Sequence, residues 1–185
     1  MNQDFIVSPR VVIIGSSCAG KSTFAQALAK ARSCPCIELD ELFWGPDWTP
    51  KPSADFLRLV TEAAAGDTWV ASGNYGTSRE ILWARATTIV WLNFSLPRVL
   101  WRGLRRTVGR VVSGRELFHG NRESFRQAFL SRESILWWIV STFARRRLEF
   151  EALRASGQFA HETWLEARTP AEAAEILAAL SAGRP

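Results

Sequence analysis

Several residue types are scarce in this chain, and each scarcity excludes a class of protein. The 185 residues include one tyrosine, one methionine, three lysines and three cysteines. Three thiols cannot all pair, and Cys34 and Cys36 offer only two metal ligands with no histidine nearby. Neither a disulfide framework nor a zinc site is therefore expected. Small buried hydrophobic side chains are the simpler role, and a reducing, cytoplasmic location fits them.

Long apolar runs are also missing. No stretch approaches the roughly 18 residues of a membrane-spanning helix, and only residues 11–14 are continuously apolar near the N-terminus. We therefore expect no membrane partner and no signal peptide. With 47% hydrophobic and 22% charged residues the composition is that of a globular protein, and the length suits a single domain over residues 1–185.

Because lysine is scarce, arginine supplies twenty of the 23 basic residues. The net charge is +5, but residues 98–147 contain twelve arginines and three acidic residues, which gives that segment +9. The planar guanidinium fork suits phosphate or carboxylate. Two interpretations are open: a solvated helix face that forms ion pairs with the acidic remainder, or a segment that faces a bound anion.

Short apolar runs alternate with helical patterns along the chain. We predict strands at 11–14, 36–39, 68–71, 87–92 and 159–165. Helices are predicted at 22–31, 53–65, from 77, 95–111, 122–130, 132–155 and from 170, with N-caps at Ser53, Ser95 and Thr169 and a capping box of Thr77 and Glu80. Five short strands interleaved with helices predict an α/β fold, with a five-stranded parallel sheet covered on both faces.

Residues 15–22 match the phosphate-loop pattern G-x-x-x-x-G-K-[ST], placed between a buried strand and a helix. Backbone N–H groups of such a loop converge on phosphate oxygens, the lysine reaches the β- and γ-phosphates, and the Ser22 hydroxyl joins the magnesium shell. We therefore predict a P-loop NTPase that binds ATP and Mg²⁺. The expected contacts come from Gly15, Ser16, Ser17, Cys18, Ala19, Gly20, Lys21, Ser22 and Thr23.

Residues outside the phosphate loop narrow the class of NTPase. No lysine is followed two residues later by an aspartate, so a GTPase guanine motif is absent. Only the second predicted strand ends in acidic residues, at Asp40 and Glu41. An acid there can order a magnesium-bound water or accept the proton of an acceptor hydroxyl, and the alternative is a helix cap or a solvated turn acid.

Aromatic residues come after Asp40 in a predicted loop over residues 42–52. Trp44 and Trp48 belong to it, and either could stack on the acceptor or simply pack the loop. Trp69, Trp91 and Trp164 fall within predicted strands and are expected in the core.

The arginine-rich segment has helical spacing. Like charges four residues apart cost about 0.2–0.5 kcal/mol per pair, so facing carboxylates or bound phosphates should compensate them. Glycines flank the segment, and we predict a short helical lid over about residues 98–131 that closes on the phosphates. Of Arg145, Arg146 and Arg147, at most two can face the site. The stripe is Arg98, Arg102, Arg106 and Arg110, and Arg122 joins the predicted clamp.

Four segments carry a family resemblance: the phosphate loop, LDELFW at 39–44, WVASGNY at 69–75 and GNRE at 120–123. Together they resemble the bacterial adenylate-kinase-like P-loop NTPase family, a group also described as DNA topology-modulation proteins or AAA-family ATPases. The resemblance covers about residues 10–155 and implies a nucleoside-monophosphate-kinase-like fold. Segments 106–110 and 113–115 are similar to the arginine motifs that open the adenylate kinase lid.

One departure from adenylate kinases concerns the acceptor. Those enzymes carry Asp-Gly-Phe-Pro-Arg after the third strand, where this chain has SGNY at 72–75, and the nearest arginine lies further along. The resemblance thus implies an ATP-binding kinase fold without specifying a monophosphate acceptor. Ligands of open α/β sheets bind at the carboxyl edge. We expect the acceptor there, against Asp40, Trp44, Gly73, Asn74, Tyr75 and Arg79.

Two functions of different class are consistent with these residues. The first is an ATP-dependent phosphotransferase that moves the γ-phosphate to a nucleotide or another small molecule. The second is an ATP-binding regulator or nucleic-acid-associated ATPase, which is less favoured because no recognised DNA-binding motif accompanies the arginines. An ATP-binding protein without turnover is a third. The catalytic residues expected for the first are Lys21, Asp40, Arg102, Arg106, Arg110 and Arg122.

Overall fold

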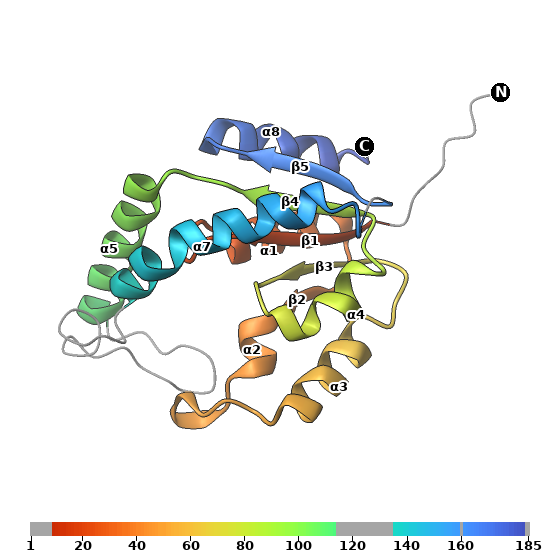
Figure 1. Ribbon diagram of the computed structural model, residues 1–185, viewed down its shortest axis with the longest axis horizontal. Helices are drawn as coiled ribbons and strands as arrows, with labels where there is room; N and C mark the ends of the chain where they lie inside the picture. Colours follow the sequence, from red (N-terminus) through yellow and green to blue (C-terminus); the bar gives the residue numbers. More distant parts are fainter. Residues whose placement is uncertain (1–8, 114–134, 160, 184–185) are drawn as a thin grey trace.

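A parallel sheet organises the part of the chain that this computed structural model describes, residues 9–113, 135–159 and 161–183 (Figure 1). Helices and two short 3₁₀ turns connect its strands. The elements in chain order are β1 (Arg10–Gly15), α1 (Lys21–Arg32), β2 (Cys36–Glu38), α2 (Leu39–Phe43), η1 (Pro46–Trp48), α3 (Ser53–Ala63), β3 (Trp69–Ser72), η2 (Gly76–Ser78), α4 (Arg79–Trp83), β4 (Thr88–Leu92), α5 (Leu96–Ser113), α7 (Ile135–Ala155), β5 (Thr163–Ala167) and α8 (Pro170–Ser181).

The strand order is β2-β3-β1-β4-β5, and every pair of neighbours is parallel. The predicted five-stranded parallel sheet is thereby confirmed. β1 lies in the centre, between β3 and β4, so the loop after it emerges at the middle of the carboxyl edge. The ends of β3 and β4 flank that loop, and the short helix α2 begins at the same edge of the sheet, after β2.

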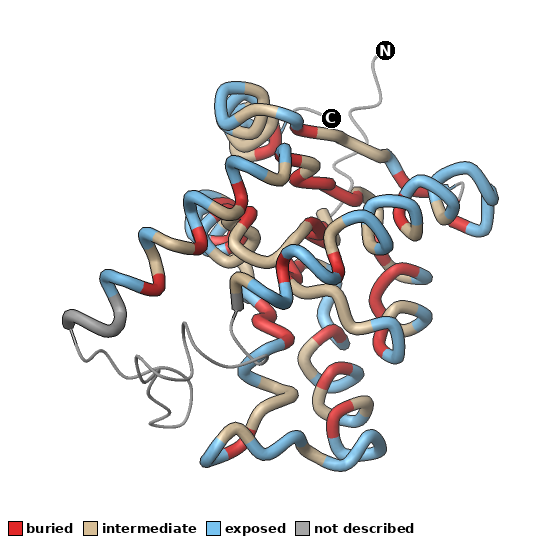
Figure 2. Tube along the Cα trace, turned by 60° about the vertical axis from the view of Figure 1, so that its left-hand side comes forward, coloured by how far each residue is buried: buried red, intermediate tan, exposed pale blue. Residues whose placement is uncertain are grey.

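Helices cover both faces of the sheet because β1 is apolar on both sides. Val12 and Ile14 belong to a core cluster with residues of α3, α4 and α7. Val11 and Ile13 belong to a second cluster with residues of α1 and α8. All four are at most 1% exposed, and burial of such a side chain stabilises the fold by roughly 1.5–3 kcal/mol. Figure 2 shows the buried strands inside and the mixed burial of the outer helices.

Residues 42–52, predicted to be a loop, contain more structure than expected. The end of α2 and the turn η1 lie within them. The Lys51 ammonium explains part of this order, since it donates to the carbonyls of Glu41, Leu42 and Trp44 at 3.4, 3.0 and 3.1 Å. Carbonyls at a helix C-terminus otherwise lack donors. This cation, 7 to 10 residues further along the chain, thus stabilises the end of α2 and the hairpin after it, in which Trp44 pairs with Pro50.

Some predicted boundaries are wrong, for identifiable reasons. Ser53 is the first residue of α3 rather than its cap, and Ser78 rather than Thr77 precedes α4, without a side-chain cap in either case. The fifth strand begins at Thr163, because the chain first turns through a hydrogen bond from the Glu162 N–H to the Phe159 carbonyl.

The cap of the last helix is confirmed. Thr169 accepts a hydrogen bond from the Glu172 N–H at 3.2 Å, and Pro170 occupies the first helical position, as the sequence predicts.

The described part of the predicted lid, residues 98–113, belongs to α5, which packs against α7. A Cβ atom at Gly103 would lie 3.1 Å from Ile139 Cδ1, so glycine permits this close approach. The predicted helix at 122–130, Arg122 and the side chain of Arg110 lie outside the described residues. None of the described helices combines the length and the apolar character required to span a membrane.

Candidate active site

The phosphate loop joins β1 to α1 and adopts backbone angles that favour glycine. Gly15 has φ +146° and Gly20 has φ +97°. A Cβ atom at Gly15 would lie 2.6 Å from the Leu92 carbonyl oxygen, so no side chain fits there. Cys18 also has positive φ, at +61°. The loop therefore curls at the N-terminus of a 12-residue helix, where backbone N–H groups and the helix dipole favour an anion.

Lys21 folds back onto this loop. Its ammonium donates to the carbonyls of Gly15 and Ser16, each at 3.1 Å. Burial lowers the pKa of Lys21 to about 8; Asp40 opposes this effect, and Arg146 and Arg106 add to it. The charge of Lys21 is thus influenced by one nearby acid and by two nearby cations. A bound polyphosphate would offer it oxygens in place of the backbone carbonyls.

Ser22 contacts a buried acid that sequence reasoning did not select. Its hydroxyl donates to Glu38 Oε2 at 2.9 Å, and the Ser72 hydroxyl donates to the same oxygen at 2.9 Å. Glu38 is 6% exposed, and this burial raises its pKa although the two hydroxyl bonds oppose the effect. The motif hydroxyl, the end of β2 and the end of β3 therefore meet at one carboxylate.

Asp40 lies on α2, directly after β2, and contacts Tyr75. The tyrosine hydroxyl donates to Asp40 Oδ1 at 2.7 Å, and its ring packs against Phe43 and Phe56 with centroids 4.6 and 5.2 Å apart. Burial raises the pKa of Tyr75, and the Asp40 charge raises it further. Trp44 packs edge-on against Phe43 at 4.9 Å. The predicted acceptor residues Asp40, Trp44 and Tyr75 thus form one aromatic and acidic cluster.

The other predicted acceptor residues, Gly73, Asn74 and Arg79, each contact a different part of the structure. A Cβ atom at Gly73 would lie 2.7 Å from Leu39 Cβ, so this glycine allows β3 and α2 to approach closely. The Asn74 side chain contacts Gly15 of the phosphate loop. Arg79 forms an ion pair with Glu149 of α7 and stacks over Trp83 at 5.1 Å, which ties α4 to α7.

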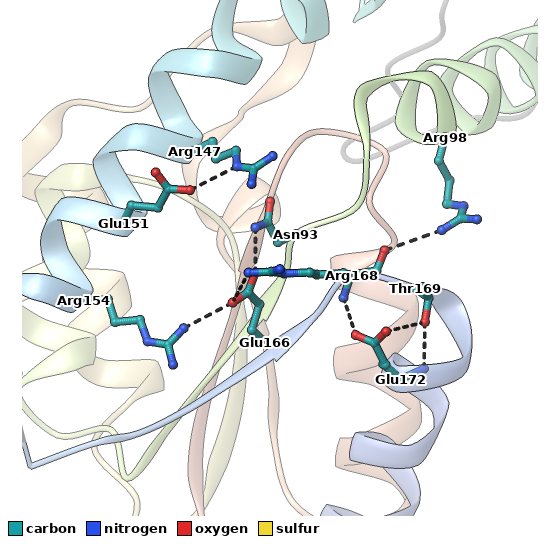
Figure 3. Close-up of polar contacts among 9 residues, drawn as sticks. All are labelled: Asn93, Arg98, Arg147, Glu151, Arg154, Glu166, Arg168, Thr169 and Glu172. Atoms are coloured by element: carbon teal, nitrogen blue, oxygen red, sulfur yellow. Dashed lines mark hydrogen bonds and ion pairs between the residues drawn. The ribbon is translucent and has the colours of Figure 1, made fainter.

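The arginines of α5 diverge although they share a stripe. Arg98 donates to the Arg168 carbonyl at 3.5 Å (Figure 3). Arg102 donates to the Ala19 carbonyl at 3.0 Å, so it touches the phosphate loop. The Arg106 Nε is buried without a partner within the described residues, and its charge acts on Lys21. Of the predicted clamp residues, Arg102 thus contacts the loop, and the charge of Arg106 lies near enough to influence Lys21.

Arg146 is a further site cation. It donates from its terminal nitrogen to the Asn74 carbonyl at 3.2 Å, and its Nε is buried without a partner in the described part of the chain. Burial lowers its pKa, and Glu149 opposes that effect. Arg145 and Arg147 are exposed. One member of the triple run faces the site, and only the packing of α7 determines which.

A second polar network fixes β5 beside the site. The Glu166 carboxylate accepts from Asn93 at 2.8 Å and pairs with Arg154 at 3.2 Å and Arg168 at 2.7 Å (Figure 3). Burial alone would raise the pKa of Glu166, but the hydrogen bonds from Arg168 and Asn93 outweigh it and lower that pKa. The network ties α7, β4 and β5 together at the carboxyl edge.

Comparison with solved structures finds kinases whose folds resemble that of this chain. Neither a protein-family model nor a curated protein sequence matches the chain. A gluconokinase from Sinorhizobium meliloti 1021 aligns at 20% identity over 96% of this chain and 91% of its own, with a TM-score of 0.52. A shikimate kinase from Bacteroides thetaiotaomicron aligns at 16% identity over 94% and 97%, with a TM-score of 0.54. A sugar kinase from Janibacter sp. HTCC2649 aligns at 20% identity over 95% and 97%, with a TM-score of 0.50. The chain therefore has a P-loop kinase-like fold.

Proposed function

We propose that this protein is an ATP-dependent phosphotransferase that acts on a hydroxyl group of a small molecule. The observation that carries the proposal is the position of Asp40 within electrostatic reach of Lys21, on the carboxyl edge that holds the phosphate loop. A cation for the phosphates and an acid for the acceptor hydroxyl are the two groups that phosphoryl transfer requires of the protein.

The triphosphate is assigned to the phosphate loop. The backbone N–H groups of the loop and the Lys21 ammonium bind the phosphates. Arg102, Arg106 and Arg146 supply further positive charge around these phosphates. Within the described residues the buried Nε atoms of Arg106 and Arg146 have no partner. This supports the assignment, because buried donors without acceptors are costly and a phosphate oxygen would satisfy them. Positioned cations supply most of the catalysis in phosphoryl transfer. Arg110 and Arg122 remain predicted members of the same arginine-rich lid, which begins in α5.

The magnesium ion is assigned to the side of the phosphate loop where Ser22 meets Glu38. Mg²⁺ is usually held by one or two protein oxygens, together with water and substrate phosphates. Ser22 and Glu38 supply such oxygens beside the loop, 2.9 Å from each other. Ser22 is assigned as the direct ligand and Glu38 as the acceptor for a magnesium-bound water. When bound, the ion neutralises charge on the β- and γ-phosphates.

The reaction assigned to the site is a direct transfer. The acceptor hydroxyl oxygen forms a bond to the γ-phosphorus, and the bond from that phosphorus to the β–γ bridging oxygen breaks. The hydroxyl proton passes to the Asp40 carboxylate, and the products are ADP and a phosphate monoester. Tyr75, which holds one Asp40 oxygen, orients the carboxylate for this step.

A hydroxylated acceptor suits the residues around Asp40. A carboxylate accepts hydrogen bonds from hydroxyl groups, and the aromatic side chains of Trp44 and Tyr75 offer flat surfaces to an apolar ring face. The three solved structures are named as kinases of gluconate, shikimate and a sugar, and all of these are hydroxylated. The phosphate loop and the motifs at 39–44, 69–75 and 120–123 resemble those of adenylate-kinase-like proteins, so a nucleoside or nucleotide acceptor is tested as well.

The test is ADP release from ATP and Mg²⁺ with a panel of sugars, sugar acids and nucleosides. Lys21→Ala should abolish acceptor-dependent release. Lys30→Ala, which removes an exposed lysine later in the same helix, should retain it. If no acceptor stimulates release and the protein instead binds duplex DNA with a steep salt dependence, the nucleic-acid alternative replaces the kinase.

A further inference from the structure

The Asn74 side chain lies where the pairing of β1 with β3 ends. The two strands pair as far as Ile13 opposite Ser72, and the Gly73 N–H then donates to the Ile13 carbonyl at 3.4 Å. Beyond this point Asn74 Nδ2 donates to the Gly15 carbonyl at 2.5 Å, and Asn74 Oδ1 accepts from the Gly15 N–H at 3.3 Å. A side-chain amide has the donor and acceptor of a peptide group. Asn74 therefore continues the ladder onto the first residue of the phosphate loop.

Gly15 is consequently held from both sides. On the side of β4 it is paired in register with Leu92, whose carbonyl oxygen would lie 2.6 Å from a Cβ atom. On the side of β3, the main chain leaves for η2 and only the Asn74 amide takes the place of a strand. Both polar groups of Gly15 are thus fixed before any ligand arrives, which is the preorganisation that anion binding by backbone N–H groups requires.

The Gly15 carbonyl also accepts from Lys21, whose ammonium lies 3.1 Å away. A carbonyl oxygen has two lone pairs, so Asn74 and Lys21 can bond to it together. When Lys21 moves to a phosphate, the carbonyl keeps its bond to Asn74. Without Asn74 the same movement would leave a part-buried acceptor unpaired, which is unfavourable. The amide therefore lowers the cost of releasing Lys21 to a ligand.

The main chain of Asn74 serves a second site cation. Its carbonyl accepts from Arg146 of α7 at 3.2 Å. Asn74 thus contacts the phosphate loop through its side chain and the half-buried Arg146 through its backbone. Tyr75, the next residue, binds Asp40 on the acceptor side.

We propose that Asn74 is a positioning residue whose side-chain amide fixes the first peptide of the phosphate loop and frees Lys21 to bind nucleotide phosphates. This inference rests on the proposed function, since it requires a polyphosphate ligand. It replaces the expectation that the Asn74 side chain contacts the acceptor, because both of its polar groups are directed at Gly15.

The test uses the full chain with Asn74→Ala, Asn74→Asp and the matched control Asn93→Ala. Asn93 comes directly after the adjacent strand β4 at the same edge, but its amide donates to Glu166 instead of the loop. Dissociation constants for ADP, inorganic tripolyphosphate and adenosine are measured by calorimetry, below the melting temperature of each variant. Adenosine lacks phosphates, so a general loosening of the fold would affect it as much as ADP.

Asn74→Ala should weaken ADP and tripolyphosphate about tenfold and leave adenosine within about twofold. Asn74→Asp should weaken both phosphate ligands further, since it keeps the acceptor for the Gly15 N–H, loses the donor and adds a negative charge. Asn93→Ala should bind all three as the wild type does. Unchanged tripolyphosphate binding in Asn74→Ala, or an equal loss of adenosine, overturns the positioning role alone. A wild-type protein that binds neither phosphate ligand overturns the proposed function and this inference with it.

Discussion

The Ser22 hydroxyl donates to the buried Glu38 carboxylate at 2.9 Å, which joins the first turn of α1 to the last residue of β2. Ser22 belongs to the phosphate-loop motif, and Glu38 belongs to no motif that the sequence displays. Their contact places a carboxylate beside the hydroxyl expected to bind magnesium. Magnesium-dependent nucleotide binding should therefore depend on both residues.

Glu38→Gln should weaken binding of Mg-ADP by about tenfold while leaving magnesium-free ADP unchanged or tighter. The neutral amide is a poorer acceptor for a magnesium-bound water, and it removes a negative charge near the phosphates. Calorimetry with and without Mg²⁺ checks this. Glu62→Gln, on the exposed side of α3, is the control and should change neither value. Equal weakening in both conditions would contradict a role through the metal.

Arg146→Ala should reduce affinity for ATP by about tenfold, because it removes a half-buried cation from the ligand site. Arg145→Ala is a closely matched control, since Arg145 is the preceding residue on the same helix and is exposed. Nucleotide titration of both variants separates the two. If the variants behave alike, the assignment of Arg146 to the triphosphate is wrong.

Tyr75→Phe should lower acceptor-dependent turnover about tenfold with little change in ADP affinity. The substitution keeps the ring contacts with Phe43 and Phe56 and removes only the hydroxyl that holds Asp40. Steady-state kinetics and an ADP titration measure the two quantities on one preparation. A loss of ADP affinity as large as the loss of turnover would show that Tyr75 does not act through Asp40.

Glu162 should destabilise the protein as the pH rises. Both of its carboxylate oxygens are buried without a hydrogen-bond partner among the described residues, and burial raises its pKa to about 8. An acid whose pKa is higher in the folded state holds its proton on folding, so stability falls between the ordinary pKa near 4.5 and pH 8.

Glu162→Gln should flatten that slope and make the protein more stable than the wild type at pH 9, with a much smaller effect at pH 5. Urea unfolding at both pH values provides the measurement, and Glu175→Gln, exposed on α8, is the control. A wild-type stability that is flat across this range would mean that the Glu162 carboxylate is solvated.

The features that could be predicted from the sequence are local in origin. The phosphate loop, the alternation of strands and helices, and the Thr169 cap each depend on residues within one short segment. Glu38 did not stand out because β2 is only three residues long, and its burial depends on pairing with β3 and on the approach of Ser22. Three consecutive arginines look alike in sequence, and only the packing of α7 directs Arg146 inward.

The order in residues 42–52 was missed for the same reason. Lys51 closes that hairpin by reaching back to three carbonyls, a contact that no short-range pattern encodes. Asn74 shows the complementary case: its placement at the correct edge of the sheet was predictable, but the direction of its side chain, toward Gly15, depends on the register of β1 and β3.

The most direct measurement of the central claim is ³¹P NMR of the protein with ATP, Mg²⁺ and the acceptor panel. The proposed phosphotransfer predicts that the γ-phosphate signal is replaced by a phosphate monoester signal in equal amount, together with ADP, and that Asp40→Asn and Lys21→Ala abolish it. Conversion of the γ-phosphate to inorganic phosphate alone, whichever acceptor is present, would contradict it.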